Sequence, residues 1–167
     1  MPEELHAQAA TTLGRALGAA CKLLALLGGA VLSALVLMSV ASIGGRMIGR
    51  PIQGDFELVQ FGCAVAIAFF LPYCQLNHGN IIVDFFTLRA RPRTRGVLDA
   101  LGAVLLAVVM ALVAWRTGAG AVAMKAGGET SMIMSVPLWY AYALMTPAFA
   151  LTAIAGLYTA WRTWKAA

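Results

Sequence analysis

The sequence predicts an all-α membrane protein with four transmembrane helices and both termini in the cytoplasm, forming a single membrane domain over residues 1–167. Three observations lead to this prediction. The composition is 61% hydrophobic and 11% charged, whereas soluble domains are about 45–50% apolar and about 25% charged. Four nearly uncharged stretches are each long enough to cross a bilayer, which takes about 20 residues. Basic residues gather in alternate connecting segments.

The first predicted span covers residues 23–45 and is bracketed by Lys22 and Arg46. Before it, a leucine or alanine recurs at every fourth position from Leu5 to Leu17, which is close to the spacing of one helix face. This tail is either an N-terminal interfacial helix lying on the cytoplasmic surface or a plain extension of the first span. The sequence leaves both alternatives open.

The second predicted span, residues 58–76, starts directly after two acidic residues and contains Pro72. A proline inside a transmembrane helix removes one backbone hydrogen bond, so we expect a bend there and not a break. The third span, residues 97–116, is the weakest, because it reaches the required length only if Asp99 lies at the membrane interface.

The fourth predicted span, residues 137–161, is part of a longer uncharged stretch, residues 130–161. That stretch is too long for one upright helix. We therefore place the helix start at Pro137, with Ser135 as its cap, since proline favours the first turn of a helix and serine the capping position. Residues 132–134 then form a short membrane-surface or re-entrant piece.

The distribution of basic residues predicts the orientation in the membrane. Cytoplasmic loops carry an excess of Lys and Arg. The two tails and the loop 77–99 hold Arg15, Lys22, Arg89, Arg91, Arg93, Arg95, Arg162 and Lys165, against Arg46, Arg50, Arg116 and Lys125 in the other loops. Both termini are therefore expected in the cytoplasm, which requires an even number of spans. The net charge of +5 is accounted for by this bias, and we expect no nucleic acid partner.

The predicted spans lack the ionisable residues and catalytic motifs that a transporter or enzyme acting alone would need. Proteins that transport by themselves keep an ionisable residue inside the membrane, whereas every acidic residue here lies at or outside a predicted helix end. The sequence has no histidine pair for haem and no HExxH, GxSxG or phosphate-loop motif. We assign no catalytic residue, metal or cofactor, and we do not expect an enzyme.

These absences favour a membrane protein that depends on a partner. One alternative is a self-assembling small four-helix channel or exporter, which the missing intramembrane charge disfavours. Another is the membrane anchor of a redox complex, which would need haem or quinone ligands. At the start of the second span, capping and the helix dipole explain Asp55 and Glu57, although a partner contact for Glu57 stays open.

Three segments together resemble the small membrane subunit (DctQ type) of tripartite ATP-independent periplasmic transporters, or TRAP transporters. They are residues 54–62, residues 78–84, and residues 128–131 followed by 136–139, in the same order across four spans. The resemblance implies a soluble periplasmic receptor that captures an organic anion, often a carboxylate. It also implies a large multi-span subunit that moves the anion by sodium symport. The small subunit would be a scaffold for the large one and part of the receptor's docking surface.

The resemblance also assigns roles to residues. Glu57 matches the family's acid at the start of the second span, Asp84 its acid after that span, and Glu129, Pro137 and Trp139 the start of its fourth span. These five residues are candidates for the partner interface. No role is carried over to the histidine after the second span, because the sequence departs from the family pattern between His78 and Ile81.

The same topology points to residues that face the receptor. The predicted periplasmic loops are residues 46–57 and 116–131. Charges at the rim of an interface steer encounter more than they add affinity. We therefore predict that Arg50, Lys125 and Glu129 face the receptor.

Overall fold

The computed structural model describes residues 12–49, 52–77 and 92–166. This part of the chain contains four helices and no strand: α2 (Thr12–Met47), α3 (Asp55–Leu76), α4 (Pro92–Gly127) and α5 (Trp139–Ala166). Each helix is long and apolar enough to cross a membrane. The prediction of an all-α protein with four helices of membrane-spanning length is therefore confirmed, while the predicted orientation of the termini stays a prediction.

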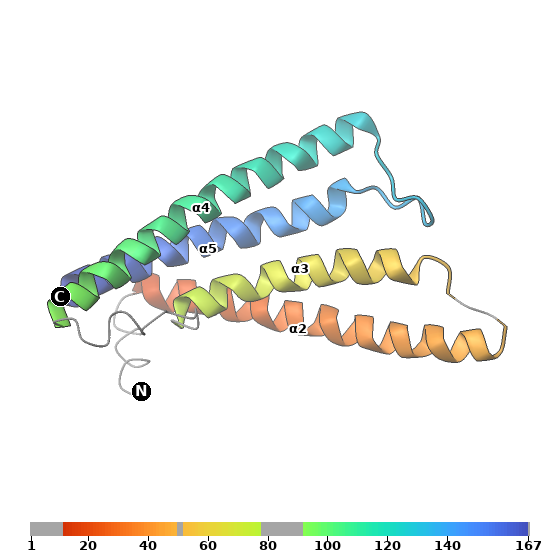
Figure 1. Cartoon of the computed structure of the whole chain (residues 1–167), viewed down its shortest axis with the longest axis horizontal. Helices are drawn as coiled ribbons and strands as arrows, with labels where there is room; N and C mark the ends of the chain where they lie inside the picture. The colour runs from red at the N-terminus through yellow and green to blue at the C-terminus, as the bar shows by residue number, and fades with distance from the viewer. Residues whose placement is uncertain (1–11, 50–51, 78–91, 167) are drawn as a thin grey trace.

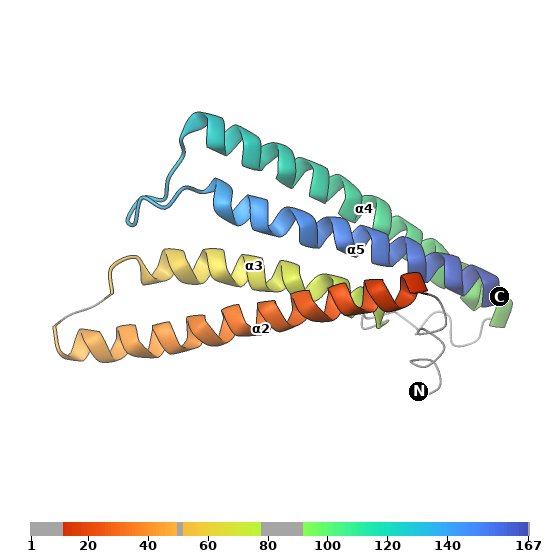
Figure 2. The same ribbon diagram turned by 180° about the vertical axis from the view of Figure 1, so that it is seen from behind.

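The helices lie in a row and do not form a closed bundle. Figures 1 and 2 show α4 beside α5, α5 beside α3, and α3 beside α2. The inner helices are thus α3 and α5, and the outer helices α2 and α4 form the two edges. The start of α2 and the end of α5 lie at the same end of the row (Figure 1), as an even number of spans requires.

The two outer helices are longer than the predicted spans. Both α2 and α4 have 36 residues, about 54 Å at 1.5 Å per residue, against a hydrocarbon core of about 30 Å. Residues 12–22 continue into the first span as one helix, so this part of the tail is a plain extension; residues 1–11 lie outside the described residues. The prediction of a loop over residues 116–131 is wrong for residues 116–127, because α4 continues to Gly127.

The start of α5 also differs from the prediction. The helix begins at Trp139, two residues after Pro137. Pro137 instead pairs with Thr130 in an isolated antiparallel bridge, and Ser135 has a positive φ of 53°, so it is not the cap. The prolines inside the spans interrupt neither helix, since α3 continues through Pro72 and α5 through Pro147.

Two apolar clusters hold the row together. Near the shared end of α2, α3 and α5, the first cluster contains Leu17, Cys21, Leu76, Ala155 and Tyr158. The second joins the middle of α3 to α5 and contains Val65, Ala68, Phe69, Ala141 and Ala148. Beside the first cluster, the amide of Gln75 donates a 3.2 Å hydrogen bond to the buried hydroxyl of Thr159. The central α3–α5 contact is therefore mainly apolar with one polar pair.

Small residues set the distance between neighbouring helices. A Cβ placed on Gly28 of α2 would lie 3.1 Å from the Cβ of Phe69 and 3.2 Å from a backbone oxygen of α3. On Gly156 of α5, it would lie 3.0 Å from the Cβ of Ala107 in α4. Small residues let helix backbones approach closely in a membrane. The close approach of α2 to α3 therefore depends on Gly28.

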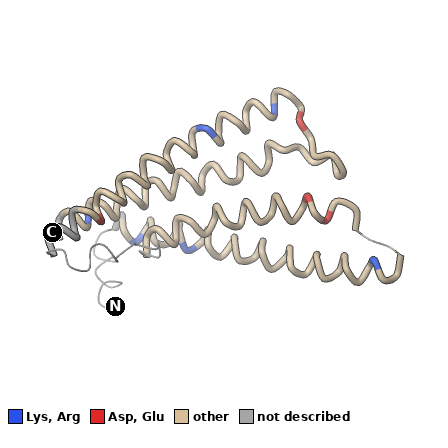
Figure 3. Tube along the Cα trace, viewed as in Figure 1, with Lys and Arg blue, Asp and Glu red and all other residues tan. Residues whose placement is uncertain are grey.

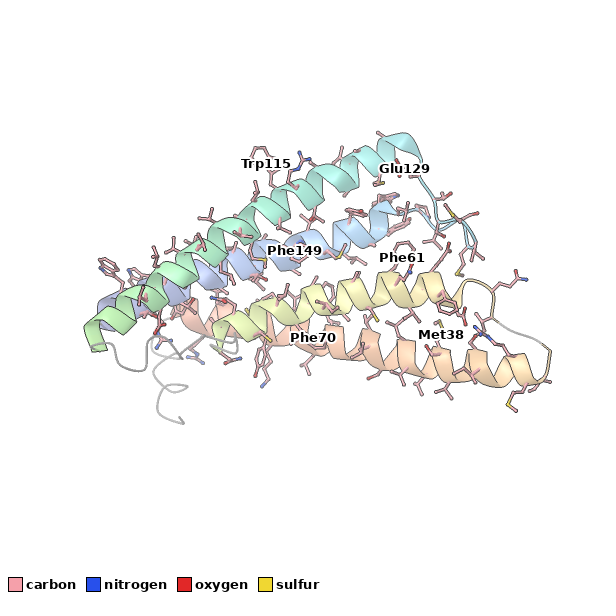
Figure 4. All side chains as sticks on the ribbon, in the orientation of Figure 1. Met38, Phe61, Phe70, Trp115, Glu129 and Phe149 are labelled. Atoms are coloured by element: carbon pink, nitrogen blue, oxygen red, sulfur yellow. The ribbon has the colours of Figure 1, made fainter. Side chains whose placement is uncertain are left out.

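Much of each helix carries no charged residue. In Figure 3 the acidic residues (red) lie only at the two ends of the row, and the stretches between them are mostly tan, the colour of residues other than Lys, Arg, Asp and Glu. Large apolar side chains, among them Leu37, Leu105 and Leu144, are exposed along the helices. Figure 4 shows Trp115 pointing away from the row at the α4 edge. Such a surface is suited to lipid or to the helices of another membrane protein.

Candidate functional site

The predicted interface residues that the structure describes all lie at one end of the row. We call it the loop end; it comprises residues 42–49, 52–57 and 125–139, where α2 and α4 end and α3 and α5 begin. Three groups of polar contacts connect neighbouring elements here. Together they determine which surfaces this end presents.

The α4–α5 connection is a short paired loop. Gly128 ends α4 with φ of 63°, and the amides of Gly128 and Glu129 bond to the carbonyls of Lys125 and Met124 at 3.4 and 3.2 Å. This is the Schellman arrangement, in which glycine takes the left-handed position after a helix. The arms then pair: Ser131 N–H donates to Val136 O at 2.9 Å, and Leu138 N–H to Glu129 O at 3.1 Å.

The carboxylate of Glu57 clamps the tip of this loop to the first turn of α3. It accepts hydrogen bonds from the Ser131 hydroxyl at 2.7 Å, the Ile133 amide at 3.0 Å and the Met134 amide at 3.2 Å. The Ser131 hydroxyl also accepts a hydrogen bond from the Val136 amide at 3.3 Å. Bonds to an ionised acceptor are about twice as strong as neutral ones. This contact, which we call the Glu57 clamp, joins segments 74 positions apart.

Gly54 lets the loop approach the start of α3. It has a left-handed conformation with φ of 77°, which favours glycine. A Cβ at this position would also overlap the side chain of Met134. The helix begins without a side-chain cap, although the Asp55 carboxylate accepts a 2.9 Å hydrogen bond from the amide of Phe56. Loop and helix therefore contact each other at a position where only a residue without a side chain fits.

Asp55 ties α3 to the end of α2. Its carboxylate accepts a 2.7 Å hydrogen bond from the buried hydroxyl of Ser42 and forms an ion pair with Arg46. The sequence alone explains the two acids by capping and the helix dipole. The first turn of α3 indeed holds both acids, but their carboxylates also reach two different neighbours, α2 and the α4–α5 loop.

A third contact ties α4 to α5. The ammonium group of Lys125 lies 5.0 Å from the centroid of the Trp139 ring, within the range of a cation–π interaction. The Trp139 ring stacks on Tyr140, with centroids 4.0 Å apart. Lys125, in the last turn of α4, is exposed, and its ammonium group contacts the Trp139 ring of its own chain.

The other predicted residues are distributed as follows. The side chain of Glu129 is exposed, and Figure 4 shows it at the end of α4. Pro137 is in the paired loop next to Trp139. Arg50, His78 and Asp84 lie outside the described residues. The structure thus brings Glu57, Glu129, Pro137 and Trp139 to one end, while their role in a partner interface stays a prediction.

Some residues of this site were not singled out from the sequence. Ser42 and Ser131 are mild polar residues, and nothing in their local sequence marks them as partners of the two acids. The motif that contains Ser131 was part of the resemblance, but its contact with Glu57 requires knowing that α3 lies beside the α4–α5 loop. Among the described residues, no group of His, Cys, Asp and Glu side chains could hold a metal ion.

The family model described as "Tripartite ATP-independent periplasmic transporters, DctQ component" matches residues 35–166. The chain belongs to this family. The match covers the last part of α2, residues 35–47, and all of α3, α4 and α5. Neither the curated proteins nor the solved structures include a match to the chain.

Membership makes this chain the small permease subunit of a TRAP transporter, a multi-pass membrane protein and a transporter component. It confirms the resemblance drawn from the short motifs. The DctQ component implies association with a large TRAP subunit and with a periplasmic binding protein. At the loop end of this DctQ chain, polar contacts and exposed apolar residues occur together.

Proposed function

We propose that this chain braces the large TRAP subunit in the bacterial inner membrane, with its loop end in the periplasm as part of the docking surface for the solute receptor. The complex would take up an organic anion, such as a carboxylate, driven by a sodium gradient. In this proposal the chain itself does not bind the transported anion, since substrate contacts belong to the receptor and the large subunit.

The observation that carries the bracing role is the open row of helices. In a closed bundle, each helix buries a stripe against two neighbours, whereas here the edge helices α2 and α4 keep large apolar side chains exposed along their length. Helix association in a membrane depends on close packing. The exposed apolar side chains of the two edge helices therefore offer an extended packing surface to a larger membrane protein.

The loop end supports the docking role. Its tip presents Met132, which is 98% exposed, and Ile133, which is 60% exposed, while the Glu57 clamp holds the backbone beneath them. The exposed charges of Lys125 and Glu129 flank this tip. A fixed apolar tip with charges at its rim combines contact area with electrostatic steering.

Copurification from the native membrane tests the bracing role. We expect a C-terminally tagged chain, extracted gently, to bring a large multi-span protein with it in stoichiometric amount. Recovery of the chain alone as a stable homo-oligomer, together with ion flux through the purified chain, would contradict the proposal and favour a self-assembling channel.

Uptake measurements test the docking role. We expect Lys125→Glu to slow receptor-dependent uptake and to change its dependence on salt, because reversing a rim charge mainly alters the association rate. Lys22→Glu is the matched control, since it makes the same charge reversal on an exposed lysine at the other end of the row. If both variants keep normal uptake at every salt concentration, Lys125 does not face the receptor.

A further inference from the structure

Arg116 is a charged residue inside the edge helix α4. The sequence places it at the end of the third predicted span, but the helix continues to Gly127. At 1.5 Å per residue, α4 extends about 16 Å beyond Arg116. Between Asp99 and Lys125, Arg116 is the one charged residue of the helix. The structure therefore moves this charge from a loop into a helix of membrane-spanning length.

The neighbouring helix α5 shows how deep Arg116 lies. Arg116 is two positions before Gly118, and a Cβ on Gly118 would lie 3.3 Å from the side chain of Thr146 in α5. Helix α5 has no charged residue from Trp139 to Trp161, about 33 Å, and a hydrocarbon core of about 30 Å has to cover most of this stretch. Thr146 is about 10 Å inside it. Arg116 therefore lies within the hydrocarbon core, whichever side of the membrane the loop end faces.

The guanidinium of Arg116 has no partner in the described part of the chain. Its side chain is exposed, and it forms no hydrogen bond, ion pair or ring contact with another described residue. No acidic residue lies between Asp99 and Glu129 in the sequence. Because Cα–Cβ bonds tilt toward the start of their helix, the side chain of Arg116 leaves α4 in the direction away from the loop end. It is therefore poorly placed to reach the headgroups there.

An arginine at this depth needs an anion from another molecule. Charged side chains are costly in hydrocarbon, and in membrane proteins they face other protein or water and pair with an opposite charge. The guanidinium group stays charged, and its planar shape suits two parallel hydrogen bonds to a carboxylate. A second copy of this chain in the same orientation would bring another Arg116 to the same level, where like charges repel. The complementary partner is a different helix that carries an acidic residue.

The exposed face of α4 around Arg116 is suited to such a helix. Leu105 and Leu112 precede Arg116 on this face, and Ala119 and Ala123 follow it, all of them exposed. Spacings of three, four and seven residues place them on one side of the helix. Small residues let helices approach closely in a membrane, so a partner helix can come within reach of the guanidinium. Helix α5 packs against a different face of α4.

We propose that this face of α4 packs against the large TRAP subunit, where the Arg116 guanidinium pairs with a carboxylate on one of that subunit's transmembrane helices. The proposal rests on the bracing role and selects one edge of the row. Both edge helices expose apolar side chains, but α2 has no charge between Lys22 and Arg46. Lipid suffices to cover the α2 edge, whereas it would leave the charge of Arg116 unpaired.

Photocrosslinking in the native membrane tests which edge meets the large subunit. A benzoylphenylalanine in place of Leu112, one turn from Arg116 on the same face, should crosslink to a large multi-span protein. The matched control carries the same photoreactive residue in place of Leu37 of α2, since the two leucines are 57% and 71% exposed. We expect little or no such product from Leu37. Crosslinks to the large protein from Leu37 alone, or from Leu112 only to lipid or to a second copy of the chain, would overturn the proposal.

Copurification of variants tests the charge pair. Arg116→Leu removes a charge from a membrane helix, which favours insertion, so the variant should reach the membrane in normal amount. The large subunit that copurifies with it should decrease roughly tenfold or more, because association then leaves a carboxylate unpaired within the interface. Arg15→Leu is the matched control, since it makes the same change at an exposed arginine at the opposite end of the row. It should leave the copurified amount unchanged.

The two measurements separate this proposal from the bracing role. If the unchanged chain brings the large subunit with it, but Arg116→Leu does so equally well, Arg116 makes no charge pair and the proposal is overturned while the bracing role stands. If the unchanged chain brings no large subunit at all, the bracing role itself is contradicted.

Discussion

Glu57 shows how one carboxylate can fix a surface that it does not itself form. Its three hydrogen bonds go to one hydroxyl and two backbone amides of the loop, so it orders the loop backbone whatever side chains the tip carries. The exposed side chains of Met132 and Ile133 remain available to a partner. From the sequence, Glu57 could cap the helix or contact a partner. The structure adds a further contact, because the carboxylate also binds the chain's own α4–α5 loop.

Replacing Glu57 should loosen the loop without unfolding the helices. In Glu57→Gln the loop amides lose an ionised acceptor, and bonds to charged groups contribute more than neutral ones. We expect hydrogen exchange at the Ile133 and Met134 amides to become roughly tenfold faster, with exchange in the middle of α3 unchanged. Mass spectrometry of the protein in detergent measures both.

The control for this variant is Glu129→Gln in the same loop. Its side chain is exposed, and its backbone hydrogen bonds to Met124 and Leu138 do not involve that side chain, so exchange at the Ile133 and Met134 amides should stay as in the unchanged protein. Equal exchange in the unchanged protein and in Glu57→Gln would show that the loop is held by its own backbone pairing and not by the clamp.

At the scale of helices, two adjacent glycines of α2 have opposite surroundings. A side chain on Gly28 would meet Phe69 and the α3 backbone, whereas one on Gly29 would meet nothing within 4 Å. We expect Gly28→Val to reduce the free energy of unfolding by about 1–3 kcal/mol through overpacking. Gly29→Val, with the same effect on helix propensity, should cost less, as measured by unfolding in detergent.

This pair also tests the order of the row. If Gly29→Val proved as destabilising as Gly28→Val, that result would contradict the contact of the Gly28 face of α2 with α3. The sequence left this point open, because four-residue spacings of small residues in α2 occur on more than one face. Only the position of Phe69 on the neighbouring helix decides which glycine lies at the contact.

The helices could be predicted from the sequence because long uncharged runs have few alternatives in a membrane. Their ends could not be predicted equally well. Residues 117–120 contain two glycines and follow Arg116, which is typical of a loop. In the structure they remain helical, since Gly118 and Gly120 pack against Thr146 and Tyr142 of α5. Tertiary packing here outweighs the low helix propensity of glycine.

The site was predictable in its location but not in its contacts. Acids at the start of a span and aromatic residues at the start of another are visible as local patterns, and both Glu57 and Trp139 do lie at the loop end. The pairing of Glu57 with Ser131, and of Asp55 with Ser42, depends on which helices are neighbours. One sequence carries no information about that order when all four helices are similarly apolar.

For the whole molecule, the distribution of basic residues predicts that the loop end faces the periplasm. Replacing Cys21, Cys63 and Cys74 by alanine allows single cysteines to report this. We expect Met132→Cys to react in intact cells with a maleimide that cannot cross the inner membrane, and Ala167→Cys to react only after the membrane is opened. The reverse pattern would invert the orientation, and reaction of both in intact cells would contradict an even number of spans.

The order of helices in the row also has a consequence for biogenesis. Helices that are consecutive in the chain, α2 with α3 and α4 with α5, are neighbours in the row, so each pair can leave the translocon as a helical hairpin with its main contacts already made. The contact between α3 and α5 and the Glu57 clamp join the pairs afterwards. From this order we expect assembly in two steps, of which the second, the joining of the two hairpins, is open to influence from a partner subunit.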